Sequence, residues 1–160
     1  MTLVWTRVDQ KLIHGQVSVA WVPYLGADAI VVTDYDTCDD LWGQEVMAMG
    51  VPPEVRDTYF TSPPLLAGLL ASDELKSRRV MVIFSNLEGV LEAAEAGFVL
   101  DTLNLGNQCS DGQPDTIRLA ESFYVNCQDM IGLTRLHMAG LEVILQAVPA
   151  GKAVKWRPTK

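Results

Sequence analysis

Short apolar runs alternate along this chain with segments whose polarity has the period of a helix. Residues 29–33 and 80–84 are apolar at almost every position and rich in β-branched side chains. Strands that are apolar on both faces are typical of a parallel sheet covered by helices on each side. We therefore predict a single α/β domain over residues 1–160, a three-layer doubly wound fold with a mainly parallel sheet of six or seven strands.

The same patterns predict where each element lies. Strands are expected at 2–8, 29–33, 56–60, 80–84, 102–105, 123–125 and 141–148. Helices are expected at 17–25, from Asp36 or Thr37 to 49, after Ser62 and Pro63, at 87–96 and at 127–138. The tail from Gly151 is predicted to be a mobile surface segment around Trp156.

Composition excludes several classes of protein. A hydrophobic share of 49% with 20% charged residues indicates a globular chain, and the net charge of −8 argues against nucleic acid. Cys38, Cys109 and Cys127 are odd in number and lack zinc-site spacing, so we expect reduced thiols in a cytosolic protein. No leader peptide is recognisable and no apolar run approaches the ~20 residues of a membrane span, so we expect any membrane role to pass through a partner.

The stretch from Arg7 to Gln16, RVDQKLIHGQ, concentrates polar side chains and a histidine between two apolar runs. His14 is expected on a turn between a strand and a helix, at the carboxyl end of the strand, where open parallel sheets place their ligands. A histidine there can act as a base, a metal ligand or a nucleophile toward phosphorus.

The neighbours of His14 favour phosphorus over a metal. Arg7 and Lys11 are cations that would stabilise phosphoryl oxygens, and the Gly15 N–H at a helix start would add a backbone donor. Asp9 could hold one ring nitrogen as N–H and leave the other as the nucleophile, or it could orient Arg7 or Lys11. The alternative on residue types alone is a histidine bonded to backbone, beside solvated cations.

The run RVDQKLIHGQV resembles the active-site signature R-[IV]-D-D-R-L-I-H-G-Q-V of the cytoplasmic IIB components of mannose/fructose/sorbose-type sugar phosphotransferase systems. Trp21 also falls where many members of that family carry a tryptophan. The resemblance continues through AIVVTD, the Val-Pro-Pro at Val51, RVMVIFSNLEGVLEAAEAG, LNLGN and GLEVILQAVP. It therefore covers nearly the whole chain apart from the C-terminal tail.

This resemblance implies a phosphohistidine carrier of the protein-Npi-phosphohistidine–sugar phosphotransferase type. His14 would take a phosphoryl group from a histidine of a IIA partner and pass it to a sugar held by a membrane IIC/IID complex. Asp9 would be the second catalytic residue, with Arg7, Lys11 and Gly15 around the phosphate and no cofactor or metal. The protein would be cytoplasmic and peripherally associated with the inner face of the membrane through these partners, and a homodimer stays open.

Three residues depart from the family pattern. Gln10 replaces a second acid, Lys11 replaces an arginine and so loses the planar fork that grips two phosphate oxygens, and Asn107 replaces a second glycine. These positions lie in loops that face the sugar complex in the family. They favour an alternative function, a regulatory or binding module that reports phosphorylation state to a protein partner. A nucleotide- or flavin-binding domain is a third class, but no glycine-rich phosphate loop supports it.

Two further strand ends carry polar residues. Ser85 and Asn86 follow the strand at 80–84, where they cap a helix or reach the same crevice as His14. This strand end borders the active site in the family, so Ser85 and Asn86 are expected to contact the phosphate or a partner. Asp34, Asp36, Asp39 and Asp40 follow the strand at 29–33. Helix capping explains these acids better than a magnesium pocket.

Overall fold

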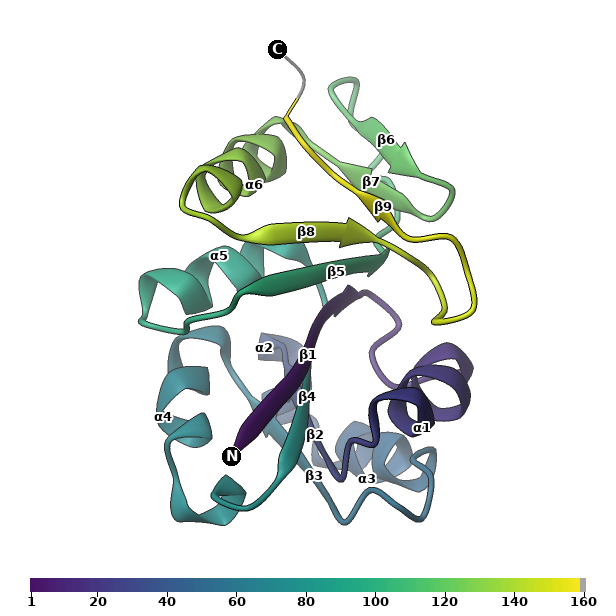
Figure 1. Cartoon of the computed structure of the whole chain (residues 1–160), viewed down its shortest axis with the longest axis vertical. Helices are drawn as coiled ribbons and strands as arrows, with labels where there is room; N and C mark the ends of the chain where they lie inside the picture. The colour runs from purple at the N-terminus through teal and green to yellow at the C-terminus, as the bar shows by residue number, and fades with distance from the viewer. Residues whose placement is uncertain (159–160) are drawn as a thin grey trace.

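Seven strands form one sheet in the computed structural model, which describes residues 1–158 (Figure 1). The spatial order is β3-β2-β4-β1-β5-β8-β9, and every pairing is parallel except that of β9 with β8. The strand bounds are β1 (Thr2–Asp9), β2 (Ala29–Thr33), β3 (Asp57–Thr61), β4 (Arg79–Phe84), β5 (Thr102–Asn107), β8 (Glu142–Leu145) and β9 (Val154–Lys155). The predicted doubly wound, mainly parallel sheet is confirmed.

Helical segments cover both faces of this sheet. Their bounds are η1 (Gln16–Trp21, π-helical), α1 (Val22–Leu25), α2 (Tyr35–Asp39), α3 (Leu41–Met49), η2 (Pro63–Leu65, 3-10), α4 (Leu66–Leu70), η3 (Asp73–Leu75, 3-10), α5 (Leu87–Glu95) and α6 (Cys127–Met138). One apolar core lies under η1, α1 and α3, and the other lies under α4, α5 and α6. Within residues 1–158, no helix combines the length and apolar character needed to cross a membrane.

The central strands contribute to both cores, because successive side chains of a strand point to opposite faces. Ile30 and Val32 of β2 pack with Trp21, whereas Ala29 and Val31 pack on the side of α4 and α5. Every residue of β2 is buried. The apolar runs in the sequence are therefore strands that are covered on both faces.

The single helix expected from Asp36 or Thr37 to residue 49 is wrong, because two helices form there. Asp34 caps α2, and its carboxylate accepts a hydrogen bond from the Thr37 N–H at 2.9 Å. Asp40 then ends α2 and caps α3, accepting from the Gly43 N–H at 2.9 Å. The second acidic cap makes the chain turn where a continuous helix was predicted.

Two features lie beyond the predicted sheet. The strand expected at 123–125 is present as β7 (Phe123–Val125), but it pairs with β6 (Ile117–Ala120) in a separate antiparallel hairpin. The tail, expected to be a mobile surface segment around Trp156, is exposed over residues 151–155 but adds β9 to the edge of the sheet. The Trp156 N–H donates to the Val143 carbonyl at 2.9 Å and the indole is buried. Thr159 and Lys160, the end of that predicted segment, lie outside the described residues.

Candidate functional site

The carboxyl end of β1 carries a fully buried charged pair, Arg7 and Asp9. Because β1 lies between β4 and β5, Arg7 is in register with Asn104 of β5. Its guanidinium lies against the β5 backbone at Gly106, where a β-carbon would overlap it, and 5.5 Å from the centroid of the Trp21 ring. The absence of a side chain at Gly106 therefore makes room for the buried cation.

All five N–H groups of Arg7 have acceptors within the protein. Nε and Nη2 donate to Asp9 Oδ2 at 3.0 and 2.8 Å, and Nη1 donates to Asn104 Oδ1. Nη1 also donates to the Gln146 carbonyl at 3.1 Å, and Nη2 to Gln16 Oε1 at 3.5 Å. The arrangement makes Arg7 a support for Asp9, and the phosphoryl contact expected for Arg7 from the sequence stays a prediction.

Asp9 joins Arg7 to the histidine. Its Oδ2 lies 2.9 Å from His14 Nε2, and its Oδ1 accepts from the Lys11 N–H at 3.1 Å. Burial raises the pKa of the Asp9 carboxyl, but the His14 hydrogen bond and the Arg7 charge outweigh burial and leave the pKa below its ordinary value. Asp9 is therefore ionised at neutral pH and accepts the Nε2–H of His14.

The His14 ring is held at one nitrogen and open at the other. Its side chain is 22% exposed, and Nε2 is the nitrogen that faces Asp9. Nδ1 has no hydrogen-bond partner among the residues that the structure describes. The alternative of a histidine bonded to backbone does not fit, because the ring bonds a carboxylate. The tautomer with hydrogen on Nε2 leaves the Nδ1 lone pair available.

The loop between Asp9 and His14 is held by Gln10 and Leu12. The Gln10 N–H donates to the Asn107 carbonyl at 2.8 Å, and Gln10 Oε1 accepts from the Cys109 N–H at 2.8 Å. Leu12 has a φ of 53°, a left-handed conformation that is strained for this residue type, while its side chain packs in the core. Asn107, expected in a loop after the strand at 102–105, is the last residue of β5.

Lys11 and Gly15 lie on the exposed side of this loop. Gly15 precedes η1 with an ordinary right-handed φ of −51°, and nothing lies within 4 Å of the position that a β-carbon would take. Neither backbone strain nor packing therefore demands glycine at this position. A small residue there leaves the space next to His14 open.

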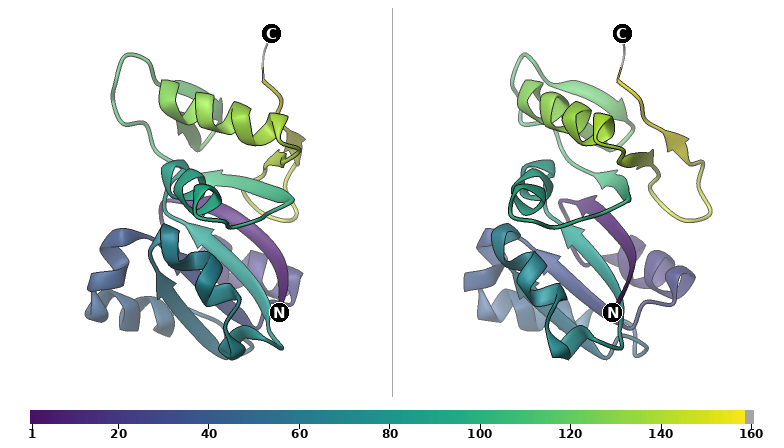
Figure 2. Two further views of the ribbon diagram at one scale, coloured as in Figure 1. Left: turned by 90° about the vertical axis from the view of Figure 1, so that its left-hand side faces the viewer. Right: turned by 60° about the vertical axis from the view of Figure 1, so that its left-hand side comes forward.

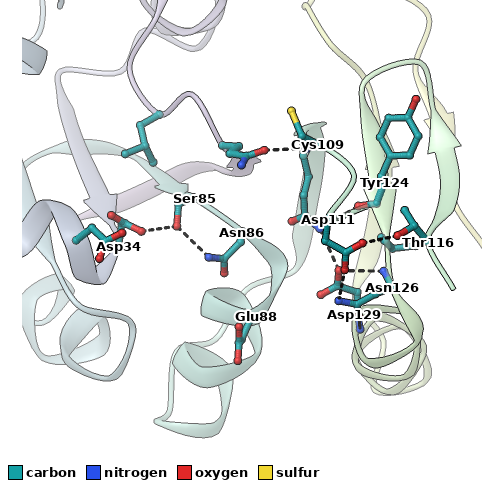
Figure 3. Close-up of a pocket in the computed structure, with 15 residues that line it drawn as sticks. Asp34, Ser85, Asn86, Glu88, Cys109, Asp111, Thr116, Tyr124, Asn126 and Asp129 are labelled. Atoms are coloured by element: carbon teal, nitrogen blue, oxygen red, sulfur yellow. Dashed lines mark hydrogen bonds between the residues drawn. The ribbon is translucent and has the colours of Figure 1, made fainter. Parts of the chain in front are cut away.

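Ser85 and Asn86 line a neighbouring cleft (Figure 3). Ser85 Oγ donates to Asp34 Oδ1 at 2.6 Å, and Asn86 Oδ1 accepts from the Gly89 N–H at 2.8 Å, which confirms Asn86 as the cap of α5. The cleft has a volume of about 430 Å³, and Gln10 and Leu12 of the His14 loop contribute to its lining. His14 itself does not.

Carboxylates dominate this cleft, and its lining contains no Lys or Arg. The acidic residues in the lining are Asp34, Asp36, Glu88, Asp111 and Asp129. Burial raises the pKa of Asp129, whereas a hydrogen bond from Thr116 lowers the pKa of Asp111. No cluster of His, Cys, Asp or Glu suited to a metal ion occurs within residues 1–158.

The chain matches a known family over nearly its full length. The family described as the sorbose subfamily IIB component of the PTS system, the sugar phosphotransferase system, matches residues 3–159. This chain belongs to that family. The resemblance seen in the sequence is thereby confirmed.

Relatives of this IIB component cover almost all of it. The N-acetylgalactosamine-specific phosphotransferase enzyme IIB component 2 of Escherichia coli (strain K12) is 27% identical over 154 residues, covering 95% of this chain and 94% of the relative. The crystal structure of the N-acetylgalactosamine-specific IIB component 1 from Escherichia coli has a TM-score of 0.83 at 26% identity, covering 98% of this chain and 100% of that one. The mannose-specific EIIAB component of Escherichia coli (strain K12) is 23% identical over 155 residues, which are 97% of this chain and 47% of that relative.

The site of this IIB component includes residues that the sequence patterns did not single out. Asn104, Gly106 and the Gln146 carbonyl surround the Arg7 guanidinium. Trp21 Nε1 donates to the Ala147 carbonyl at 2.9 Å and so ties η1 to the segment after β8. Asn104 could have been found from the sequence, because it is a polar residue inside an otherwise apolar strand. A buried side-chain amide needs hydrogen-bond partners, so its presence there indicates a buried polar contact.

Proposed function

We propose that this IIB component is a phosphohistidine carrier in which His14 accepts a phosphoryl group from a phosphohistidine of a IIA partner. The His14 Nδ1 lone pair attacks phosphorus, a new N–P bond forms, and the N–P bond to the donor histidine breaks. A sugar hydroxyl held by a membrane IIC/IID permease then attacks the same phosphorus, an O–P bond forms, and the Nδ1–P bond breaks with its electron pair returning to Nδ1, while the hydroxyl proton passes to water. The observation that carries this proposal is the 2.9 Å contact between Asp9 Oδ2 and His14 Nε2.

That contact fixes both the tautomer and the direction of the ring. An ionised carboxylate on Nε2–H leaves Nδ1 as the nucleophile, and it stabilises the positive charge that develops on the ring as Nδ1 bonds to phosphorus. Asp9 is held in turn by Arg7, whose buried charge also keeps the Asp9 pKa low. The ring therefore needs little reorientation before transfer.

Lys11 and Gly15 are the groups that we assign to the phosphoryl oxygens. Both are exposed on the loop that carries His14. A lysine ammonium is a mobile point charge that can follow the transferring group, and a backbone N–H at a helix start adds a fixed donor. Phosphoryl transfer depends mainly on positioning and electrostatic stabilisation, so these groups and the oriented ring are sufficient without a metal.

The proposed carrier needs two partners, one that donates the phosphoryl group to His14 and one that presents the sugar that receives it. The relative named as a mannose-specific EIIAB component combines the A and B parts under one name, which supports a IIA protein or domain as the donor. We assign the sugar to a membrane IIC/IID permease, so this chain would work at the inner face of the membrane through that partner. Ser85 and Asn86, placed in the cleft beside the His14 loop, would contact a partner or substrate group that enters there.

The test is reconstitution of both transfer steps. The chain is incubated with phosphoenolpyruvate, the general phosphotransferase proteins and the IIA component, and acid-labile phosphate on the chain is measured. We expect labelling of the parent chain, and no label on His14→Ala. His137→Ala should accept phosphate as the parent chain does, because His137 Nδ1 faces the Leu141 carbonyl at 3.2 Å and lies in α6.

The second step distinguishes a transport component from a regulatory module. Permease-containing vesicles and sugars are added to the labelled chain, and loss of label from His14 is followed with time. Transfer to a sugar supports the proposal. Label that stays on His14 with every sugar would favour the regulatory alternative, and a parent chain that never becomes labelled would refute both.

A further inference from the structure

Helix α3 exposes large apolar side chains to water. Leu41, Trp42, Val46 and Met49 are all exposed, with Trp42 at 74% and Met49 at 85%, and no residue of the helix is buried. Trp42, Val46 and Met49 have the i, i+4, i+7 spacing that places side chains on one helix face. Exposed apolar groups gathered in this way mark interaction sites, and tryptophan is among the residues that contribute most to binding energy.

This face is held in a defined position. The Asp40 carboxylate caps the helix at Gly43, and the Gln44 side-chain amide donates to the Thr37 and Cys38 carbonyls at 2.7 and 3.1 Å. Met47 packs against the core beneath η1 and α1. Isolated helices of this length are marginal in water, so these contacts are what keep the apolar face formed and oriented outward.

The segment begins at the same edge of the sheet as the candidate site. Figure 2 shows α2 at the edge toward which the β4 arrow points, and α3 running back from α2 along the sheet. Asp34, at the start of α2, and Asp36 line the cleft to which Gln10 and Leu12 of the His14 loop also contribute. A partner on α3 would therefore lie beside α2, whose Asp36 lines this cleft together with Gln10 and Leu12 of the His14 loop.

The charge of the segment indicates the chemistry of that partner. Residues 34–50 contain Asp34, Asp36, Asp39, Asp40 and Glu45 and have no Lys or Arg. Cytoplasmic loops of membrane proteins carry an excess of Lys and Arg, whereas the cytoplasmic lipid surface is anionic. With a net charge of −8, the chain is repelled by the lipid surface and attracted to such loops.

We propose that α3 and the acidic residues around it form the docking surface for the basic cytoplasmic loops of the membrane permease. The apolar face formed by Trp42, Val46 and Met49 makes the central contact, and Asp39, Asp40 and Glu45 meet the basic side chains. This inference rests on the proposed function, because it assigns a surface to one of its two partners. It predicts that mutations on α3 impair binding to the permease and leave phosphate transfer from IIA unchanged.

The test compares matched substitutions on two helices. Trp42→Ala and Met49→Ala change α3, and Met138→Ala is the control, because Met138 is 81% exposed on α6. Glu45→Lys reverses a charge on α3, with Glu95→Lys on α5 as its control, since both glutamates are exposed. Each purified full-length chain is sedimented with inside-out vesicles that contain the cognate permease, and with protein-free liposomes containing anionic lipid. Phosphate uptake from IIA and circular dichroism are measured on the same samples.

We expect Trp42→Ala and Glu45→Lys to weaken vesicle binding about tenfold, the loss expected for a central interface contact. Met138→Ala and Glu95→Lys should bind as the parent does, added salt should weaken parent binding, and the liposomes should bind no chain. Phosphate uptake from IIA should stay unchanged in all variants. Equal vesicle binding by the parent and the α3 variants would overturn the inference, and so would a parent chain that binds no vesicles. The inference would also fail if the parent bound protein-free liposomes as well as permease vesicles, or if the α3 variants lost only phosphate uptake from IIA. Failure of the parent to accept phosphate would instead count against the proposed function.

Discussion

Lys11 is the residue whose replacement tests the phosphate contact most directly. Lys11 is exposed, and it donates a hydrogen bond to Asp9 through its backbone N–H and not through its side chain. We expect Lys11→Ala to slow transfer from IIA about a hundredfold, because one charge-assisted contact to a transferring phosphoryl group is worth a few kcal/mol of barrier. Rapid-quench measurement of phosphate uptake gives the rate.

Lys11→Arg is the matched variant, and it should preserve or improve the rate because the guanidinium supplies two parallel donors. Neither change should alter the free energy of unfolding by more than about 0.5 kcal/mol, since the side chain is exposed. A Lys11→Ala chain that accepts phosphate as fast as the parent would show that Lys11 is only a solvated loop residue.

Arg7→Lys should damage both stability and transfer, although it keeps the charge. Lysine cannot supply the fork that reaches Asp9, Asn104 and the Gln146 carbonyl together, so buried acceptors lose their donors. We expect the free energy of unfolding to fall by about 1–3 kcal/mol, measured by urea denaturation. Phosphate uptake should also fall under conditions where the variant remains folded, because Asp9 and the ring lose their support. A variant with parental stability and rate would show that Arg7 is not a positioning residue.

At the scale of single residues, the sequence predicted the contacts that are local in the chain. Arg7, Asp9 and His14 were expected together because they surround one strand end, and the structure places them in hydrogen-bond contact. Asn104 and Gly106 could not be assigned in this way, because their contacts with Arg7 depend on which strand lies beside β1. That neighbour is decided by the packing of the whole sheet.

Among the elements, β9 is a two-residue strand whose stability depends on the tryptophan beside it. Trp156 is buried, and its ring meets His137 edge-on, with centroids 5.8 Å apart. We expect Trp156→Ala to lower the free energy of unfolding by about 3 kcal/mol, a typical cost for truncating a buried aromatic residue. Phosphate uptake at a temperature where both chains are folded should change little.

The control for that prediction is Trp42→Ala, which removes a tryptophan of the same size from an exposed position. It should leave the free energy of unfolding within about 0.5 kcal/mol of the parent. If Trp156→Ala is as stable as the parent, the tail contributes no packing energy and the observed strand has no stabilising role.

Helices and strands that carry a capping motif or a hydrophobic period in their own sequence were predicted well. Elements that depend on contacts with distant residues were not. The predicted α6 begins and ends as observed, and its start carries a local signal, the capping box that Asn126 forms with Asp129. The break at Asp40 was missed because one acidic segment offers several residues suited to capping. β9 was missed because a strand of two residues carries no period of its own and exists only through its pairing with β8.

Over the whole molecule, Asp9 should make stability depend on pH below neutrality. Its pKa is lower in the folded chain than the value of about 3.9 for an unfolded aspartate. The unfolded chain therefore takes up the proton first as pH falls, and the contribution of Asp9 is present above about pH 4 and is lost through the lower folded-state pKa. Asp129, whose pKa burial raises, acts in the opposite direction.

Urea denaturation across an acid pH series checks this prediction. Asp9→Asn should be less stable than the parent at neutral pH, because Arg7 loses its ionic partner, and should lose less further stability on acidification. Parallel curves for the two chains would mean that Asp9 has the same pKa folded and unfolded.

The architecture as a whole was the most predictable level. Apolar runs that are buried on both faces, separated by helical segments, permit few arrangements other than a parallel sheet between two helical layers. The sequence could not show that loops from several strands form a shared cleft whose lining omits His14. That relation depends on how the loops bend after each strand ends.

The contact between Arg7 and Gly106 also limits the order in which these two positions can change during evolution. Any side chain at 106 overlaps the guanidinium while Arg7 is present, so position 106 can accept a substitution only after residue 7 has become shorter. Shortening residue 7 first removes donors from Asp9 and Asn104 before any compensating change exists. Each single step is therefore harmful, and the two positions are expected to be retained or replaced as a pair. A double-mutant cycle of Arg7→Ala and Gly106→Ala should show the cost of Gly106→Ala falling sharply once Arg7 is gone.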